Sequence, residues 1–168
     1  NRIPGGNDVV GPINKLIKFA RNHHWLLIAS RDWHPESVSA IENKKSHCIR
    51  NTEGAKFHPD LLINQDVTII SKGEFDLGRN SYSAFNGDNL SLNKFLTDNN
   101  VDTVYIAGLA TDYCVKATAI DSVKNGFVTY VVWDASKGVY FKKSEPEIKK
   151  EFIKNQIKLI TTKSIFTS

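Results

Sequence analysis

The chain has little cysteine, no long apolar run and no low-complexity segment, and each absence narrows what it can be. Its two cysteines, Cys48 and Cys114, show neither disulfide-framework nor zinc-finger spacing, which favours a reducing compartment. No apolar run approaches the length of a membrane span, so we expect no membrane partner and a cytoplasmic location, with the nucleus or another reducing compartment as alternatives. The 40% hydrophobic and 24% charged residues are typical of a globular protein with a sizeable core.

A strong concentration of one charge is also missing. The net charge is +4 and the sequence pI is about 9.0, but the lysines are scattered along the chain. The densest group, between Lys142 and Glu151, is interleaved with glutamates, as a solvated helix face would be. No nucleic-acid recognition motif accompanies it, so we expect no nucleic-acid partner.

Apolar patterns alternate along the chain between strand-like runs and helix-like spacing. The runs predict strands at 25–30, 67–71, 101–108, 127–133 and 158–162. The spacing predicts helices at 9–24, 112–125 and 145–155, and a further helix that Asp88 or Asn89 caps and that buries Leu92, Phe95 and Leu96. This alternation predicts an α/β fold of three layers, with a mostly parallel, doubly wound sheet between helices.

Cys114 lies in the segment Ala107–Val115, where a predicted strand turns into a predicted helix. Ligands of open α/β folds bind at the carboxyl ends of the strands, and the positive end of a helix favours a thiolate over a thiol. The backbone N–H groups of Ala110 and Cys114 could form an oxyanion hole in this turn. The alternative is that Cys114 is a buried cysteine that acts only as a small apolar residue.

Asp32 and His34 directly follow the first predicted strand. In an extended segment, two residues separated by one point to the same side, so this pair could hold a divalent transition metal. A third ligand is needed, for which His47 is the candidate and His58 a weaker one. The alternative is that Asp32 is a turn residue and His34 a surface residue.

Lys72 ends the second predicted strand and could hold a nearby thiolate or carboxylate as a positive charge. Alternatively, it is a lysine that leaves the sheet where a loop begins. Because the Asp32, Lys72 and Cys114 clusters each follow a different strand, all three should meet at one edge of the sheet. Their joint occurrence is more specific than any one of them.

With these clusters in place, the sequence resembles the nicotinamidases of the isochorismatase-like cysteine hydrolase superfamily. The resemblance runs from residue 5 to the end of the chain, and an Asp-x-His…His metal triad separates nicotinamidases from metal-free relatives. The matching motifs are Gly5–Asp8, Arg31–Pro35, His47–Ile49, Gly54–Leu61, Lys72–Gly73, Ser81–Phe85 and Gly108–Val115.

The resemblance implies a role for each site residue in the hydrolysis of nicotinamide to nicotinic acid and ammonia, a step of NAD salvage. Cys114 would attack the carboxamide and form a thioester, and Lys72 would stabilise the thiolate. A divalent metal, zinc foremost with iron or manganese as alternatives, would orient the pyridine ring. Tyr82 and Leu109 would line the substrate pocket, and the Leu109–Ala110 peptide would be cis. The implied metal ligands are Asp32, His34 and His47.

The sequence departs from the family pattern in two places. The family's catalytic aspartate and first strand belong upstream of Gly5, so we expect residues 1–168 to be one isochorismatase-like hydrolase domain that is incomplete at its N-terminus. Asp8 is a poor substitute for that aspartate, because it leads into the first helix. The loop before His47 has Asn43–Ser46 in place of a Trp-Pro segment.

Three alternatives to a nicotinamidase therefore stay open. One is a hydrolase of another small amide with a vestigial metal site. Another is an inactive ligand-binding relative, if the upstream aspartate is absent. A nucleic-acid-binding protein is the most distant. Homo-oligomers are common, so we also expect one here.

Overall fold

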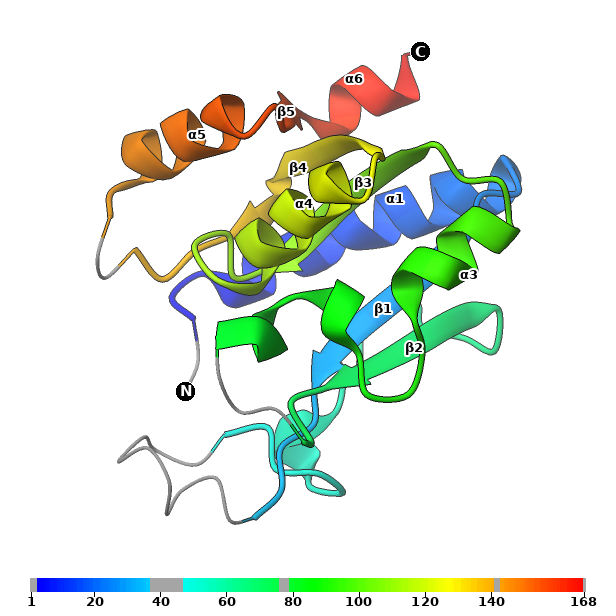
Figure 1. Ribbon diagram of the computed structural model, residues 1–168, viewed down its shortest axis with the longest axis vertical. Helices are drawn as coiled ribbons and strands as arrows, with labels where there is room; N and C mark the ends of the chain where they lie inside the picture. The colour runs from blue at the N-terminus through cyan, green and yellow to red at the C-terminus, as the bar shows by residue number, and fades with distance from the viewer. Residues whose placement is uncertain (1–2, 37–46, 76–78, 141–142, 168) are drawn as a thin grey trace.

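The computed structural model describes residues 3–36, 47–75, 79–140 and 143–167, and in this part of the chain the strands form two parallel sheets (Figure 1). β1 (Leu27–Asp32) pairs in parallel with β2 (Val67–Lys72), from Leu27 opposite Val67 to Asp32 opposite Lys72. The second sheet has the order β3-β4-β5, in which β4 is central. These strands are β3 (Thr103–Leu109), β4 (Val128–Lys137) and β5 (Lys158–Ile160).

Helices cover both faces of the three-stranded sheet, which gives the predicted three layers (Figure 1). α1 and α6 pack on one face, where Phe19 and Ile165 meet Val132 of β4. α4 and α5 pack on the other face, where Ala119 and Phe152 meet Val131. The helices are α1 (Val10–Asn22), α3 (Leu92–Asp98), α4 (Cys114–Lys124), α5 (Glu145–Lys154) and α6 (Thr162–Phe166).

α3 covers the remaining part of the core through its apolar side. Leu92 and Leu96 of α3 pack against the fully buried Ile70 of β2 and against Phe127, which precedes β4. This packing joins the two sheets through a helix. The spacing of Leu92 and Leu96 at i and i+4 is what predicts this buried side.

The sequence predicts one sheet, whereas the strands of the described residues form two. Most residues of β1, in the first sheet, and of β3, in the second sheet, are only partly buried. Trp25, which precedes β1, stacks on Tyr105 of β3 with 5.2 Å between ring centroids, and both rings are exposed by about two fifths (41% and 39%). The additional strand and the single domain over 1–168 stay predictions.

Asp88 and Asn89 do not cap α3 as predicted, because both side chains bind the β2 segment instead. The N-cap of α3 is Ser91. The Asp88 carboxylate accepts the Glu74 N–H at 2.8 Å. The Asn89 amide accepts the N–H of Ser71 at 2.8 Å and donates to the carbonyl of Ile69 at 3.0 Å, along the edge of β2 that faces away from β1.

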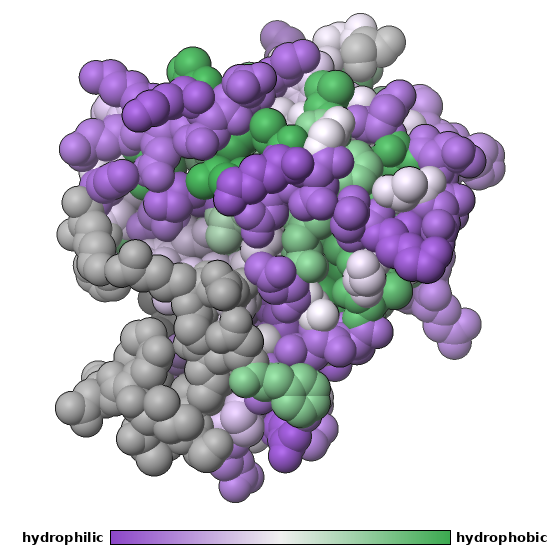
Figure 2. Space-filling model, in the orientation of Figure 1, coloured by the Kyte–Doolittle hydropathy of each residue, from purple (hydrophilic) through white to green (hydrophobic). Residues whose placement is uncertain are grey.

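The surface that faces the viewer in Figure 2 is mostly hydrophilic, with apolar patches between hydrophilic regions. None of the helices in the described residues has the length and apolarity that crossing a membrane requires.

Candidate active site

Three strand ends bring the three sequence clusters together. Asp32 ends β1, Lys72 ends β2 beside it, and Leu109 ends β3, from which a short turn leads to Cys114 at the start of α4. Parallel strands place their carboxyl ends at the same edge, where open α/β folds bind ligands. The residues are therefore close in space although far apart in the sequence.

The Lys72 ammonium group lies between Asp32 and Cys114 at this edge. The side chain of Lys72 is 2% exposed, and its ammonium group contacts both the Asp32 carboxylate and Cys114 Sγ, the latter at 3.4 Å. Burial by itself lowers the pKa of Lys72, but Cys114 and Asp32 together raise it above its ordinary value. Lys72 therefore carries its charge at neutral pH, and that charge faces the sulfur.

The pKa of Cys114 is raised, which is opposite in direction to the effect expected of the helix N-terminus alone. Burial is the largest cause, and the Asp32 carboxylate adds to it. Lys72 and the backbone of Ala110 act in the opposite direction and lower the pKa. The partial charge of a helix end is worth at most about 2 kcal/mol, which is less than the cost of burying an anion. The net effect of these surroundings is towards the thiol, and Lys72 is the charge that opposes it.

The turn that carries Cys114 is held in place by the end of β4 and by the segment that follows it. The Thr111 N–H donates to the Lys137 carbonyl at 3.0 Å, and the Asp112 carboxylate accepts the N–H groups of Val139 at 3.0 Å and Tyr140 at 2.6 Å. The Leu109–Ala110 peptide is cis, as the resemblance implies. Fixed in this way, the turn keeps the Ala110 backbone beside the sulfur.

Asp32, His34 and His47 form a cluster with one potential ligand atom each, all within 4.8 Å of one another. Two contacts bring His47 there: the His34 N–H donates to the Cys48 carbonyl, and the Arg50 N–H donates to the His34 carbonyl, both at 2.9 Å. Two imidazoles and one carboxylate suit a divalent transition metal and leave open positions. The cluster of the described residues does not include His58, whose ring lies near Asp60 instead.

The predicted substrate-lining residues border the cysteine turn. The ring of Tyr82 meets that of Tyr113 edge-on, with 5.5 Å between centroids. Leu109, at the end of β3, is 41% exposed. The segment after Tyr82 is tied to α4 because the Ala84 N–H donates to the Thr118 hydroxyl at 3.0 Å.

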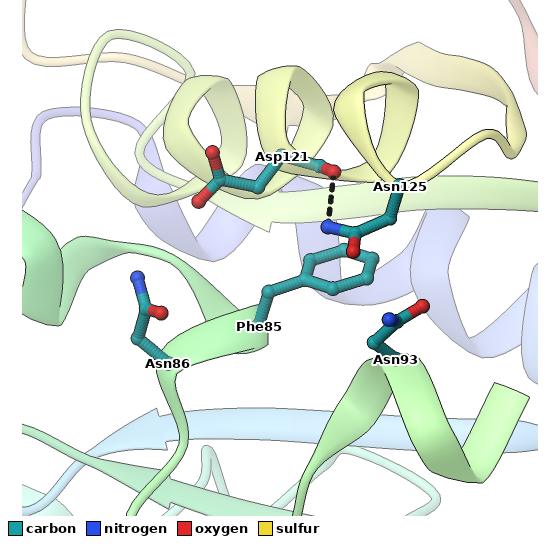
Figure 3. Close-up of a pocket in the computed structure, with 5 residues that line it drawn as sticks. All are labelled: Phe85, Asn86, Asn93, Asp121 and Asn125. Carbon is teal, nitrogen blue, oxygen red and sulfur yellow. Dashed lines mark hydrogen bonds between the residues drawn. The ribbon is translucent and has the colours of Figure 1, made fainter.

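A polar cavity of about 470 Å³ lies away from this edge, between α3, α4 and the segment around Phe85 (Figure 3). Asn125 donates to the backbone carbonyl of Asp121 at 2.8 Å on its wall. None of the predicted site residues lines it. The cavity residues are Phe85, Asn86, Asn93, Asp121 and Asn125.

Sequence reasoning missed two residues that hold the site in shape. Asp112 stands two residues before the predicted nucleophile, and its carboxylate binds the backbone N–H groups of Val139 and Tyr140. Gly73, whose φ is +79°, lies against the ring of His34. The signal available in the sequence was that Gly73 directly follows Lys72 at the end of a predicted strand. Asn43–Ser46, the departure in the metal loop, lies outside the described residues.

Comparison with known protein families shows to which family the chain belongs. The isochorismatase domain matches residues 1–163, almost the whole chain. The chain belongs to the isochorismatase family. Within this family it is 34% identical over 160 residues to the nicotinamidase of Escherichia coli, with 82% of this chain and 75% of that protein covered. It is 32% identical over 147 residues to the nicotinamidase/pyrazinamidase of Mycobacterium tuberculosis, with 82% and 77% covered.

Solved isochorismatase-family structures show the same fold. The pyrazinamidase of Pyrococcus horikoshii, determined in complex with zinc, superimposes with a TM-score of 0.84 at 35% identity, over 95% of this chain and 88% of that one. The α/β fold of the present chain is thus the fold of this family.

Proposed function

We propose that this isochorismatase-family protein is an amidohydrolase that converts nicotinamide to nicotinic acid and ammonia. The observation that carries the proposal is the contact of the buried Lys72 ammonium with both Cys114 Sγ and Asp32, beside a cluster of potential metal ligands. The similarity to the nicotinamidases of E. coli and M. tuberculosis supports the choice of substrate.

Cys114 acts as the nucleophile in this proposal. Its sulfur attacks the carboxamide carbon, and the thiol proton goes to the departing amine. Ammonia is then released, and the acyl group remains on Cys114 as a thioester. Water then cleaves the thioester, which gives the carboxylic acid and restores the thiol. Burial raises the pKa of the Cys114 thiol, and the adjacent charge of Lys72 favours the anionic sulfur at the moment of attack.

The oxyanion of the tetrahedral intermediate needs donors at the same turn. The Ala110 backbone is already directed at the Cys114 sulfur, where it lowers the pKa of the thiol. We assign the Ala110 and Cys114 N–H groups to the oxyanion. Tyr82 and Leu109 border this position and are assigned to the substrate ring.

The Asp32, His34 and His47 side chains fit a divalent metal, with zinc as our first choice because of the zinc complex of the P. horikoshii relative. When bound, the metal supplies a Lewis-acid contact for the pyridine nitrogen and thereby orients the ring. The donor chemistry supports this, because His34 uses Nδ1 for a backbone carbonyl and keeps Nε2 for a ligand.

The test is release of ammonia from nicotinamide by the full-length protein, before and after treatment with a chelator. Benzamide, which keeps the carboxamide but lacks the ring nitrogen, is the matched substrate. Hydrolysis of nicotinamide that the chelator abolishes, with benzamide a much poorer substrate, supports the proposal. Equal turnover of both amides would favour a hydrolase of other small amides.

Cys114→Ala is the matched protein variant for the same assay. It removes only the sulfur, and alanine is favourable within a helix, so α4 should be kept. Ammonia release should fall to the uncatalysed background. Activity at the wild-type rate in this variant would remove Cys114 as the nucleophile. Absence of any turnover in the wild-type protein would favour the inactive ligand-binding alternative.

A further inference from the structure

Gly73 lies where β2 ends, directly after Lys72, and its backbone has a left-handed φ of +79°. A Cβ atom added at this position would stand 2.6 Å from His34 Cε1 and 2.7 Å from His34 Nδ1. Distances this short do not occur between a real Cβ and a ring. Glycine is therefore required at position 73 for two reasons: its positive φ, and the space that the imidazole of His34 occupies.

The carbonyl of Gly73 also binds the same ring. It lies 2.9 Å from His34 Nδ1, and because a carbonyl can only accept, Nδ1 carries the proton and donates. His34 is 8% exposed, so this hydrogen bond is sheltered from water. The proton on Nδ1 leaves the lone pair of the neutral ring on Nε2.

We propose that Gly73 is the positioning residue of the metal centre, an inference that rests on the metal site of the proposed function. Its missing side chain lets the His34 ring approach the backbone. Its carbonyl selects the Nδ1–H tautomer, so that Nε2 is the ligand atom offered beside Asp32 and His47. The ligand class is a divalent transition metal that accepts two nitrogen donors and one carboxylate.

The position of Gly73 in the chain gives this role a second consequence. Lys72 contacts Cys114 Sγ at 3.4 Å, and the next residue fixes His34. The end of β2 therefore sets the place of the metal ligand and the place of the charge at the nucleophile together. A displacement of the His34 ring need not displace Lys72, whose ammonium is held by Asp32 and Cys114.

The test compares Gly73→Ala with Gly126→Ala for zinc affinity, measured by competition with a chromophoric chelator. Gly126 also has a left-handed φ, +91°, but no atom lies within 4 Å of a Cβ built there, so this variant shares the backbone strain without the contact. We expect Gly73→Ala to bind zinc 10- to 100-fold more weakly, the usual effect of losing a partner of a metal ligand, and Gly126→Ala to bind as the wild type does. Wild-type zinc affinity in Gly73→Ala would overturn the proposal.

A measurement on the wild-type protein does not depend on how well the alanine variant folds. Long-range ¹H–¹⁵N correlation spectra of the metal-free protein report which ring nitrogen of His34 carries the proton, and His34→Gln assigns the signal. We expect the Nδ1–H tautomer. An Nε2–H tautomer would overturn the proposal. Tight zinc binding without nicotinamide hydrolysis would remove the proposed activity but would leave the role of Gly73 intact, so the two failures are distinguishable.

Discussion

Replacement of Lys72 by methionine removes one positive charge from the nucleophile and keeps the volume of the side chain. Lys72 Nζ lies 3.4 Å from Cys114 Sγ. Two unit charges about 4 Å apart interact by roughly 4 kcal/mol at an effective dielectric constant of 20, and each 1.4 kcal/mol changes a population about tenfold. The loss of Lys72 should therefore lower the thiolate population of Cys114 by a factor between about ten and a thousand, the lower end allowing for screening by water.

The fold should survive this substitution. Lys72→Met leaves the Asp32 carboxylate without its ammonium partner, but that side chain is 26% exposed, so water can solvate the charge. Methionine also keeps the volume of the buried side chain, so no cavity is opened. Urea unfolding of Lys72→Met therefore serves as the check that the chemistry, and not the fold, has changed.

The assay is the rate at which iodoacetamide alkylates Cys114 at pH 7.5, followed by peptide mass spectrometry so that Cys48 is counted separately. The rate in Lys72→Met should fall at least tenfold, and nicotinamide hydrolysis should fall with it. Lys94→Met is the matched control, because Lys94 pairs with Asp98 on the surface and both side chains are more than half exposed (75% and 56%). Unchanged alkylation of Cys114 in Lys72→Met would refute the electrostatic role of Lys72.

Three further predictions concern the core, the second thiol and the metal. Phe152→Ala should lower the free energy of unfolding, measured in urea, by about 3–5 kcal/mol, because this ring is fully buried. Ile153→Ala should lower it by less than about 0.5 kcal/mol, because the neighbouring Ile153 is 65% exposed, and equal losses in the two variants would contradict the packing of α5. Burial raises the pKa of Cys48 to about 11, so its alkylation rate should be half-maximal near that pH, and a midpoint near the ordinary value would contradict this burial. His34→Ala should reduce the zinc bound per chain, measured by elemental analysis, whereas His23→Ala, on an exposed helix end, should bind as the wild type does; full zinc occupancy in His34→Ala would remove His34 from the ligand set.

Most of the fold could be predicted from local patterns in the sequence. The spacing of Ile13, Leu16 and Ala20 predicts α1, and the β-branched run around Ile70 predicts β2, because periodicity depends on which side of an element is buried. The approach of Lys72 to Cys114 also follows from the sequence, since both residues stand at the carboxyl ends of parallel strands. These predictions needed only the order of the elements.

What could not be predicted depends on contacts between distant segments. Asp88 and Asn89 look like helix caps, but β2 offers their side chains other backbone partners 14 to 20 residues away. The pKa of Cys114 depends on how deeply the fold buries the thiol, and the sequence of the turn alone does not indicate that depth. The need for glycine at 73 depends on a ring 39 residues earlier in the chain. β4 extends to Lys137, past the predicted end at 133, through its contacts with β3.

The side-chain amide of Asn89 satisfies backbone groups on the outer edge of β2. A strand at the end of a sheet offers its unpaired N–H and C=O groups to any extended peptide that comes near, which is how sheets grow between molecules. Here one side chain takes both the Ser71 N–H and the Ile69 carbonyl on the outer side of the strand. A passing chain would have to displace that amide, and also the Asp88 N–H that donates to the Ser71 carbonyl at 2.8 Å, before it could add itself to the sheet. Two consecutive residues therefore occupy this border of the strand that carries Lys72.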